Sequence, residues 1–503
     1  MLGFVLLFSA CTSSPPDNSK TLAVQLANEP VSLDPALVED GVSIRVLMNV
    51  VEGLYAYDSD GKLQPRLFDQ MEVDSSHQKY SFTLKKNARW SNGTLIEEED
   101  WIRGLKNALS PQTPAKLGEL LFVIRGAREF KAGKVGWEKV GIKLSQGRLI
   151  FELKEPAPWF PHVLVLPVAF PRKEKLTNAI YRIASYERGK IIRLEKNPHH
   201  DFWKGVVAQG TPEKIDLWIV PDETTAQKLL EQGKLDVLTR ISPFELKRLK
   251  TRVRVQAYPI LATYYIGLNV RDPWFKNPVV RRAFAASIQK DEIVQAIGGS
   301  DLPAKGWIPE GLEGYQEYEQ TSSAERTRLC NEAKKILARS SPKTPMTLIY
   351  DQSSINQIVL EKIQQDIKKH LGISVKLQAA DWKTHVRNIR SFQGSGFRFG
   401  WLSPFIDPVA HLKAFTKESV NNFTGWSNPQ FDAWIDQVSR LSPGSTRRDA
   451  ILKAQKMLLE DEAVVVPVFH YRLNHAFSAR VKQAKVNPLS VLLFNEVRIG
   501  SSE

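Results

Sequence analysis

The segment at residues 346–377 constrains the fold of this chain more than any other. Residues 346–351 (MTLIYD) have the pattern of a strand, and apolar residues then recur at helical spacing from Ile355 to Leu371. Gly372 is a residue type that often ends helices, and residues 373–377 alternate between apolar and polar. A strand, an amphipathic helix and a strand in succession predict a right-handed βαβ unit with a parallel sheet.

Further segments extend this α/β pattern to the rest of the chain. Strands are predicted at residues 21–26, 79–84, 148–158, 214–220 and 463–471, and helical spacing is found at residues 43–57 and after residue 223. The strand at 79–84 leads into a turn at Asn92 and Gly93. The chain has 503 residues, and a single core rarely grows beyond about 250–300 residues, so at least two domains are expected.

The N-terminus has the features of a processed and lipidated segment. A short apolar run, Leu2–Phe8, precedes the small residues Ser9 and Ala10 and then Cys11, which resembles the bacterial lipobox. Phe8 stands where Leu is usual, and no Lys or Arg precedes the run. We expect residues 1–11 to be a lipoprotein signal peptide with its lipobox, Cys11 to carry the lipid, and residues 12–20 to be a flexible tether. The alternative is a frayed apolar terminus.

Composition narrows the functional classes. Beyond the N-terminus no apolar run reaches the roughly 18 residues that span a bilayer, so the body of the protein is expected to be soluble. The net charge is +14, but Lys and Arg are scattered, which argues against a nucleic-acid partner. A general basic bias is the preferred explanation of the charge, and attraction to anionic membranes or acidic ligands is the alternative. If Cys11 is lipidated, Cys330 has no disulfide partner, and we expect it to be a small buried residue of a helix.

Several stretches, in order along the chain, resemble the periplasmic oligopeptide-binding proteins, a group within the bacterial extracellular solute-binding proteins of family 5. The stretches include EPVSLDP at 29–35, YSFTLKKNARWSNGT at 80–94, FELKEPAPWF at 151–160 and WSNPQFDAWI at 426–435. The resemblance implies an α/β, two-lobed periplasmic-binding-protein fold with an extra small domain and a hinged cleft. It places lobe I at 20–51, 164–258 and 474–503, the extra domain at 52–163, and lobe II at 259–473.

Signatures of enzymes and metal sites are missing from the sequence. Gly394–Gly396 (GSG) is not the G-x-S-x-G turn of a hydrolase, and neither a phosphate-binding P-loop nor an H-E-x-x-H motif is present. The adjacent pair His199 and His200 would point apart on a strand and makes a poor metal site; a surface turn is the alternative. We therefore expect a binding protein that is not an enzyme, with no cofactor and no metal.

The resemblance also implies a ligand site around Trp401. In peptide-binding relatives an Asp three residues after the matching Trp receives the amine of the ligand. Here Leu402 and Ser403 follow Trp401, and Pro404 stands at the position of the acid. A shift in register would let Asp407 take that role instead. The sequence thus predicts a changed anchor for one end of the ligand.

Further candidate residues follow from the same resemblance. Arg398 matches a position that pairs with a ligand carboxylate, for which the forked guanidinium is suited; an ordinary solvated Arg is the alternative. Trp382 resembles a cleft-lining Trp, with a core position as the alternative. One of Tyr264 and Tyr265 should face the cleft, because side chains alternate along a strand. The loop carrying Val38, Glu39, Gly41 and Val42 matches the one whose main chain pairs with the ligand.

These features predict a substrate-binding lipoprotein of an ABC importer. It would capture oligopeptides between its lobes, as a monomer that is anchored to the membrane by lipid in the periplasm or at the cell surface. It would pass the peptides to permease subunits that work with cytoplasmic ATPases. The same fold with another ligand remains open: an N-blocked or modified peptide, a murein fragment or a nickel complex. An envelope chaperone, or an enzyme built on this fold, is the alternative from another class.

Overall fold

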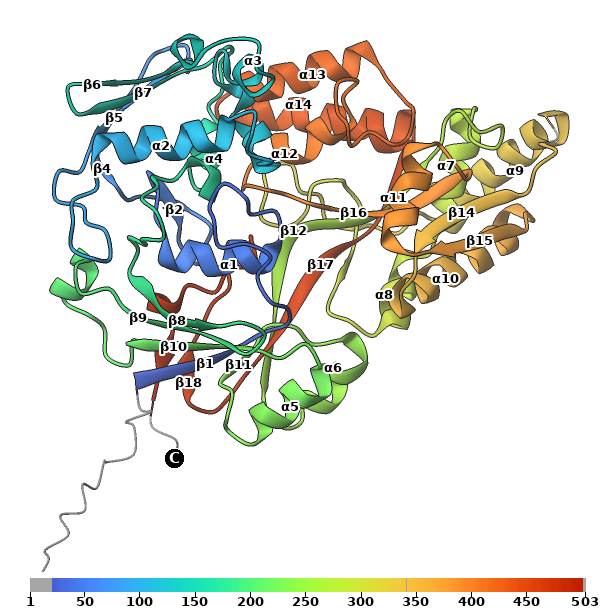
Figure 1. The fold of residues 1–503 in the computed structure, drawn as a ribbon. Coiled ribbons are helices and arrows are strands. Elements are labelled where there is room, and N and C mark those ends of the chain that lie inside the picture. Colours follow the sequence, from blue (N-terminus) through green and yellow to red (C-terminus); the bar gives the residue numbers. More distant parts are fainter. Residues whose placement is uncertain (1–19, 341, 501–503) are drawn as a thin grey trace, which may run out of the picture.

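The computed structural model of the chain describes residues 20–340 and 342–500 (Figure 1). Cys11, the expected signal peptide and residues 12–19 of the expected tether lie outside the described residues. Within the described ranges, no helix has the length and apolar character needed to cross a membrane.

A single mixed sheet runs through the molecule and includes eleven strands. Its order is β15 (Val375–Ala380), β14 (Met346–Asp351), β16 (Gly396–Leu402), β12 (Arg254–Leu268), β17 (Val465–Phe477), β11 (Val237–Leu238), β1 (Thr21–Leu26), β10 (Lys214–Ile219), β9 (Ile191–Lys196) and β8 (Tyr181–Glu187), and β13 (Leu302–Pro303) pairs with β17. We refer below to the β14 end and the β1 end of this sheet.

The predicted βαβ unit forms the β14 end. β14 and β15 pair in parallel over six residues each, and α10 (Ser354–Leu371) connects them. The predicted helix face is buried at Val359, Ile363 and Ile367. Gly372 ends the helix with φ +74°, a left-handed conformation that glycine adopts without a steric cost.

Two long strands, β12 and β17, join the two ends of the sheet. They pair antiparallel along most of their length, and the register shifts between Pro259 and Thr263. Inside this break, the N–H of Leu261 donates to the carbonyl of Pro488 at 3.1 Å, and the carbonyl of Leu261 accepts from the N–H of Ser403 at 2.8 Å. The break therefore lies between the two ends of the sheet, where the ladder between β12 and β17 is interrupted.

A separate four-stranded antiparallel sheet lies beside the main one (Figure 1). Its order is β4 (Phe68–Val73), β5 (Lys79–Leu84), β7 (Arg148–Glu152) and β6 (Ile142–Ser145), and α2 (Glu98–Leu109) and α3 (Ala127–Lys131) lie next to it. Its core is continuous with residues 261–465 of the β14 end, so the expected extra domain at 52–163 has no separate core of its own. Two short pairs complete the sheets: β2 (Tyr55–Tyr57) with β3 (Leu63–Pro65), and β18 (Val481–Gln483) with β19 (Arg498–Ile499).

The helix expected at residues 43–57 is shorter than predicted. α1 covers Gly41–Val50, and Val51 leaves the helix with φ −131° and ψ 137°. Residues 55–57 then form β2. The apolar spacing at Val46 and Val50 is helical as expected, but Leu54 serves a different core after the chain has become extended.

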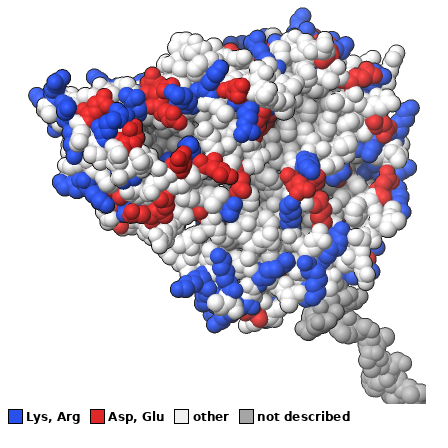
Figure 2. Space-filling view, turned by 180° about the vertical axis from the view of Figure 1, so that it is seen from behind, with Lys and Arg blue, Asp and Glu red and all other residues white. Residues whose placement is uncertain are grey.

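The remaining helices cover the sheets. They are α4 (Phe160–Val163), α5 (Glu223–Glu231), α6 (Pro243–Leu249), α7 (Pro278–Ser287), α8 (Lys290–Ile297), α9 (Ser323–Ser340), α11 (Trp382–Arg390), α12 (Val409–Leu412), α13 (Pro429–Arg440) and α14 (Ser445–Lys456), followed by a π-helical turn at Met457–Asp461. Figure 2 shows Lys and Arg intermixed with Asp and Glu over the upper part of one face, and mainly Lys and Arg at its lower end. On the face seen there, basic side chains are thus mixed with acidic ones above and outnumber them below.

Candidate functional site

The edge of β16 is where the predicted site residues converge. β16 pairs with β12, and a hydrogen bond marks each end of this pairing. The N–H of Ser403 donates to the carbonyl of Leu261 at 2.8 Å, and the N–H of Asn269 donates to the carbonyl of Ser395 at 2.9 Å. The residues of the β16 segment that bond to β12 are thus the odd-numbered ones. Antiparallel pairing alternates, so the peptide groups of the even-numbered residues point to the opposite edge.

On that opposite edge, β14 pairs only with Gly396 and Phe397. The carbonyl of Arg398 lies 2.8 Å from the Nε2 of His385. Gly400 and Leu402 lie beyond the end of β14, and the side chain of Leu402 is 56% exposed. The last residues of β16 therefore offer an open strand edge, to which an extended chain can add.

Trp382 stands close to this edge and is exposed. It is the first residue of α11, and Asp381 caps the helix by accepting from the N–H of Thr384. The indole stacks on Phe399 of β16, with ring centroids 5.5 Å apart and an interplanar angle of 23°, and 55% of the residue is exposed. An exposed large aromatic ring held flat against its neighbour suits contact with a ligand, and the core alternative for Trp382 does not fit this exposure.

Arg398 is engaged within the protein. Its guanidinium donates to the carboxylate of Asp351 at 2.8 Å and to the hydroxyl of Tyr471 at 2.8 Å, and it lies over the ring of Tyr264 at 4.6 Å. The side chains of Arg398 and Asp351 are 13% and 19% exposed. A ligand carboxylate at Arg398 would therefore share the guanidinium with Asp351, and the solvated-Arg alternative does not describe this residue.

Tyr264 and Tyr265 are both buried, contrary to the expectation that one of them faces the cleft. They point to opposite faces of β12, as strand alternation requires, but both faces are covered. Tyr264 stacks on Phe469, and Tyr265 packs edge-on against Trp307. They support the site from behind, and we correct their assignment as cleft-lining residues.

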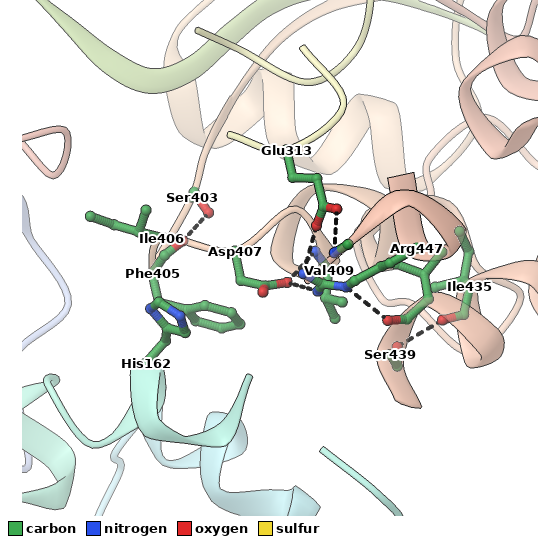
Figure 3. A network of polar contacts seen from close by, with 12 residues as sticks. His162, Glu313, Ser403, Phe405, Ile406, Asp407, Val409, Ile435, Ser439 and Arg447 are labelled. Carbon is green, nitrogen blue, oxygen red and sulfur yellow. Dashed lines mark hydrogen bonds and ion pairs between the residues drawn. The ribbon is translucent and has the colours of Figure 1, made fainter. Parts of the chain in front are cut away.

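Asp407 is held in a buried ion pair (Figure 3). Its carboxylate accepts from the Nη2 of Arg447 at 2.6 Å and from the N–H of Val409 at 2.9 Å. Arg447 also donates to the carboxylate of Glu313 at 3.0 Å. The side chains of Asp407 and Arg447 are 6% and 2% exposed. Asp407 is therefore already neutralised, and the alternative in which it receives a ligand amine is contradicted by this geometry.

The turn that follows β16 is tightly fixed. Ser403 is buried, and its hydroxyl donates to the carbonyl of Phe405 at 2.7 Å. Trp401 and Pro404 are half-buried, and both line a cavity of about 280 Å³ between this turn and residues 119–159. Ser403 thus shapes the turn, whereas Trp401 and Pro404 have surface available to a ligand.

The predicted residues near α1 belong to another part of the structure. Val38 and Val42 are buried in the core of the β1 end. Glu39 is exposed and forms an ion pair with Lys116, and Gly41 is the exposed first residue of α1, behind the capping residue Asp40. Their side chains therefore offer little to a ligand, and the expectation for this loop concerns its main chain alone.

The structure also shows where the histidine pair and the cysteine considered in the sequence lie. His200 Nε2 lies 3.2 Å from the carboxylate of the buried Glu52. Among the described residues no group of three or more His, Cys, Asp or Glu side chains is arranged to hold a metal ion. Cys330 is buried in α9, as predicted, with its sulfur 3.4 Å from the hydroxyl of Ser287.

Sequence reasoning missed several residues of this region. Asp351 and Tyr471 hold Arg398, and Trp159 and Lys413 line the cavity at Pro404. Asp351 ends a predicted strand next to β16, which is a signal that a search for acids at strand ends would find. Trp159 is more than 200 residues from Trp401 in sequence. Lys413 follows Trp401 by 12 residues, beyond the turn, and no local pattern connects either residue to Trp401.

Comparison with known proteins shows which proteins this chain is similar to. Residues 62–423 match the family described as bacterial extracellular solute-binding proteins, family 5 Middle. The oligopeptide-binding protein OppA of Bacillus subtilis is 27% identical over 94% of this chain and 93% of its own. The periplasmic oligopeptide-binding protein OppA of Salmonella typhimurium is 27% identical, over 90% and 88% of the two chains.

Solved structures agree with the fold. The periplasmic murein tripeptide binding protein MppA in its unliganded open form superimposes with a TM-score of 0.81 at 23% identity, over 96% of this chain and 97% of that one. The OppA of Haemophilus influenzae in complex with RPPGFSPFR has a TM-score of 0.77 at 22% identity, covering 96% and 100%. The expected two-lobed α/β periplasmic-binding fold is thereby confirmed.

The sheet topology, the family match over residues 62–423 and the likeness over nearly the whole chain agree, and this chain belongs to the bacterial extracellular solute-binding proteins of family 5.

Proposed function

We propose that this chain is the substrate-binding subunit of an ABC importer and captures oligopeptides between its two lobes. The open edge of β16 is the observation that carries the proposal. An extended peptide offers a donor and an acceptor at every residue, and the free peptide groups of Gly400 and Leu402 can pair with it as an added strand. Such pairing is independent of ligand sequence, because it uses the main chain alone.

The lobes keep the assignment given by the resemblance. The β1 end of the sheet corresponds to lobe I and the β14 end to lobe II, and the register break in β12 between Pro259 and Thr263 supplies a hinge. Exposed apolar side chains stand on the segments expected to face each other, Leu37 in lobe I and Trp382 and Leu402 in lobe II. Closure over a ligand would remove them from water.

Attachment to the membrane completes the proposal. Cys11 would carry the lipid, residues 12–20 would act as the tether, and the closed protein would deliver its peptide to the permease subunits as a monomer. Capture and release of an unchanged ligand suits the sequence, in which no catalytic motif was found. A murein peptide is the second candidate ligand, because the chain is also similar to the periplasmic murein peptide-binding protein MppA of Escherichia coli, with 24% identity over 93% of this chain.

The test is closure with a defined ligand. Calorimetry against tetra-alanine and against a murein tripeptide would identify a binder, and X-ray scattering would then compare the free and saturated protein. A ligand held between lobes stabilises the closed form, so the radius of gyration should fall. Saturation at 100 times the dissociation constant should raise the free energy of unfolding by about 2.7 kcal/mol. Bound ligand with an unchanged radius would contradict an interlobe site.

A further inference from the structure

A cavity of about 280 Å³ lies beside the end of the open strand edge. Its walls come from the extra domain, with Phe122 and Trp159, and from lobe II, with Trp401, Pro404 and Phe405. Trp159 and Phe405 stack face to face across the boundary, with centroids 5.6 Å apart and an interplanar angle of 5°. An extended ligand that follows β16 past Leu402 reaches this cavity with its end.

Two buried donors in the cavity walls have no partner. The indole nitrogens of Trp159 and Trp401 are both buried, and neither makes a hydrogen bond within the described residues. An indole N–H can only donate. A buried donor without an acceptor costs free energy, and most such groups in folded proteins are satisfied. The cavity is therefore short of oxygen acceptors.

A basic side chain, Lys413, is a further group in the cavity that favours an oxygen acceptor. The ammonium of Lys413 lies 5.0 Å from the centre of the Trp159 ring, and no ion pair within 4.0 Å is recorded for it within the described residues. Burial lowers the pKa of Lys413, and the nearby carboxylates of Glu155, Asp436 and Asp407 act in the opposite direction. A half-buried cation with no carboxylate of the described residues within 4.0 Å favours an approaching oxygen, especially an anionic one.

The acids around the cavity do not make it a site for a ligand ammonium. Glu155 lies 3.8 Å from Arg440, and Asp407 is paired with Arg447. Glu119 is exposed at the rim, where Arg128 and Lys154 are exposed as well. A ligand ammonium in this cavity would thus meet two donors and a lysine, and no buried acid that is free to pair with it.

We propose that this cavity is an oxygen-acceptor subsite, which receives a ligand end carrying a carboxylate or an acyl carbonyl and excludes a free ammonium. The inference deepens the proposed function and rests on it, since it names the chemistry of the peptide end held at Pro404. A carboxylate would come from the C-terminus of a peptide, and an acyl carbonyl from a blocked N-terminus. Both would accept from Lys413, or from the indole N–H of Trp159 or Trp401 once a small ring movement exposes it. A carboxylate differs from an acyl carbonyl by its charge and its second oxygen.

Four peptides separate these sources: tetra-alanine with free ends, and its N-acetylated, C-amidated and doubly capped forms. If an acyl carbonyl fills the cavity, acetylation should tighten binding at least about 5-fold. If a carboxylate fills it, amidation should weaken binding at least about 10-fold, and Lys413→Gln should remove most of that difference. Either result supports the subsite and identifies its ligand group.

Substitutions in the walls connect the effect to the cavity. Trp159→Phe keeps a ring against Phe405 and removes one donor, and should weaken the preferred peptide about 5-fold. Trp137→Phe, on a ring outside the cavity that packs against Phe130, is the matched control and should bind as the wild type does. Thermal unfolding of each variant checks that the fold is kept.

The opposite pattern would overturn the subsite. If acetylation weakens binding more than about 30-fold while Trp159→Phe and Lys413→Gln have no effect, a free ammonium is recognised here and an acid such as Glu155 holds it. If binding of all four peptides is equal, the cavity is unused and the inference fails, while peptide capture stands. If none of the four binds, the proposed function itself fails, and this inference falls with it.

Discussion

Replacing Arg447 by Met should lower the free energy of unfolding, because it leaves the buried carboxylate of Asp407 without its ion-pair partner. The carboxylate of Asp407 is 6% exposed and would keep only the hydrogen bond from the N–H of Val409 at 2.9 Å. Glu313 is 20% exposed and can be rehydrated, so most of the cost should arise at Asp407. Removing one partner of a buried ion pair typically costs about 3–5 kcal/mol, and we expect a loss in this range.

A second substitution gives this prediction a specific signature. Without Arg447, the anionic carboxylate of Asp407 is left buried without a counter-charge. Adding Asp407→Asn should recover part of the loss at pH 7.5, since the amide is neutral.

Two measurements together test it. Urea unfolding followed by tryptophan fluorescence gives the overall loss, and hydrogen exchange of the amides at 405–412 isolates the local opening in a protein of several domains. A loss below about 1 kcal/mol, or no recovery when Asp407→Asn is added, would refute the reasoning. Asp407→Asn alone should leave the relative affinity for free and acetylated peptides unchanged, because Asp407 faces Arg447 and not the ligand.

Three further predictions concern other parts of the chain. Burial lowers the pKa of both His411 and His470 to about 3, so their stabilising contribution is full above pH 6.5 and is lost as pH falls toward 3. The free energy of unfolding should then fall by about 1.4 kcal/mol per pH unit for each histidine between pH 6 and 4, and less steeply in His411→Gln; an equal slope in both proteins would contradict this origin. Trp382→Ala should weaken peptide binding by about 1–3 kcal/mol and change stability by less than about 1 kcal/mol, because the indole is 55% exposed; calorimetry and thermal unfolding measure the two effects. Mature protein from its host should carry a diacylglyceryl group on Cys11, and an intact mass without it would exclude the lipid anchor.

The regular part of the fold could be predicted from local patterns. The alternation in residues 21–26 and 79–84 gives β1 and β5, and the helix ending at Gly372 is where its spacing places it. The helix at residues 43–57 was predicted too long, because apolar spacing continues through Leu54 although the backbone is extended from Val51. Periodicity identifies a buried face but does not show to which core each residue belongs.

The site was predicted less completely, for a physical reason. Arg398 and Trp401 were found through their positions in one strand, but their function depends on what lies opposite them. Asp351 neutralises Arg398 and Arg447 neutralises Asp407, and both partners lie 40 or more residues away in sequence. Charge pairing across such distances has no local signature, so a residue that looks available in the sequence can be fully engaged in the fold.

Leu261 gives the hinge a role in communication as well as in movement. Its N–H donates to the carbonyl of Pro488 in the C-terminal segment. Its carbonyl accepts from the N–H of Ser403, in the turn that follows the open strand edge. A ligand end at Pro404 would therefore contact a turn that is hydrogen-bonded to Leu261, and Leu261 is itself hydrogen-bonded to the opposite lobe. Ligand occupancy and bending between the lobes would then be coupled through one residue, Leu261. A permease that recognises only the angle between the lobes would thereby respond to the bound ligand without contacting it.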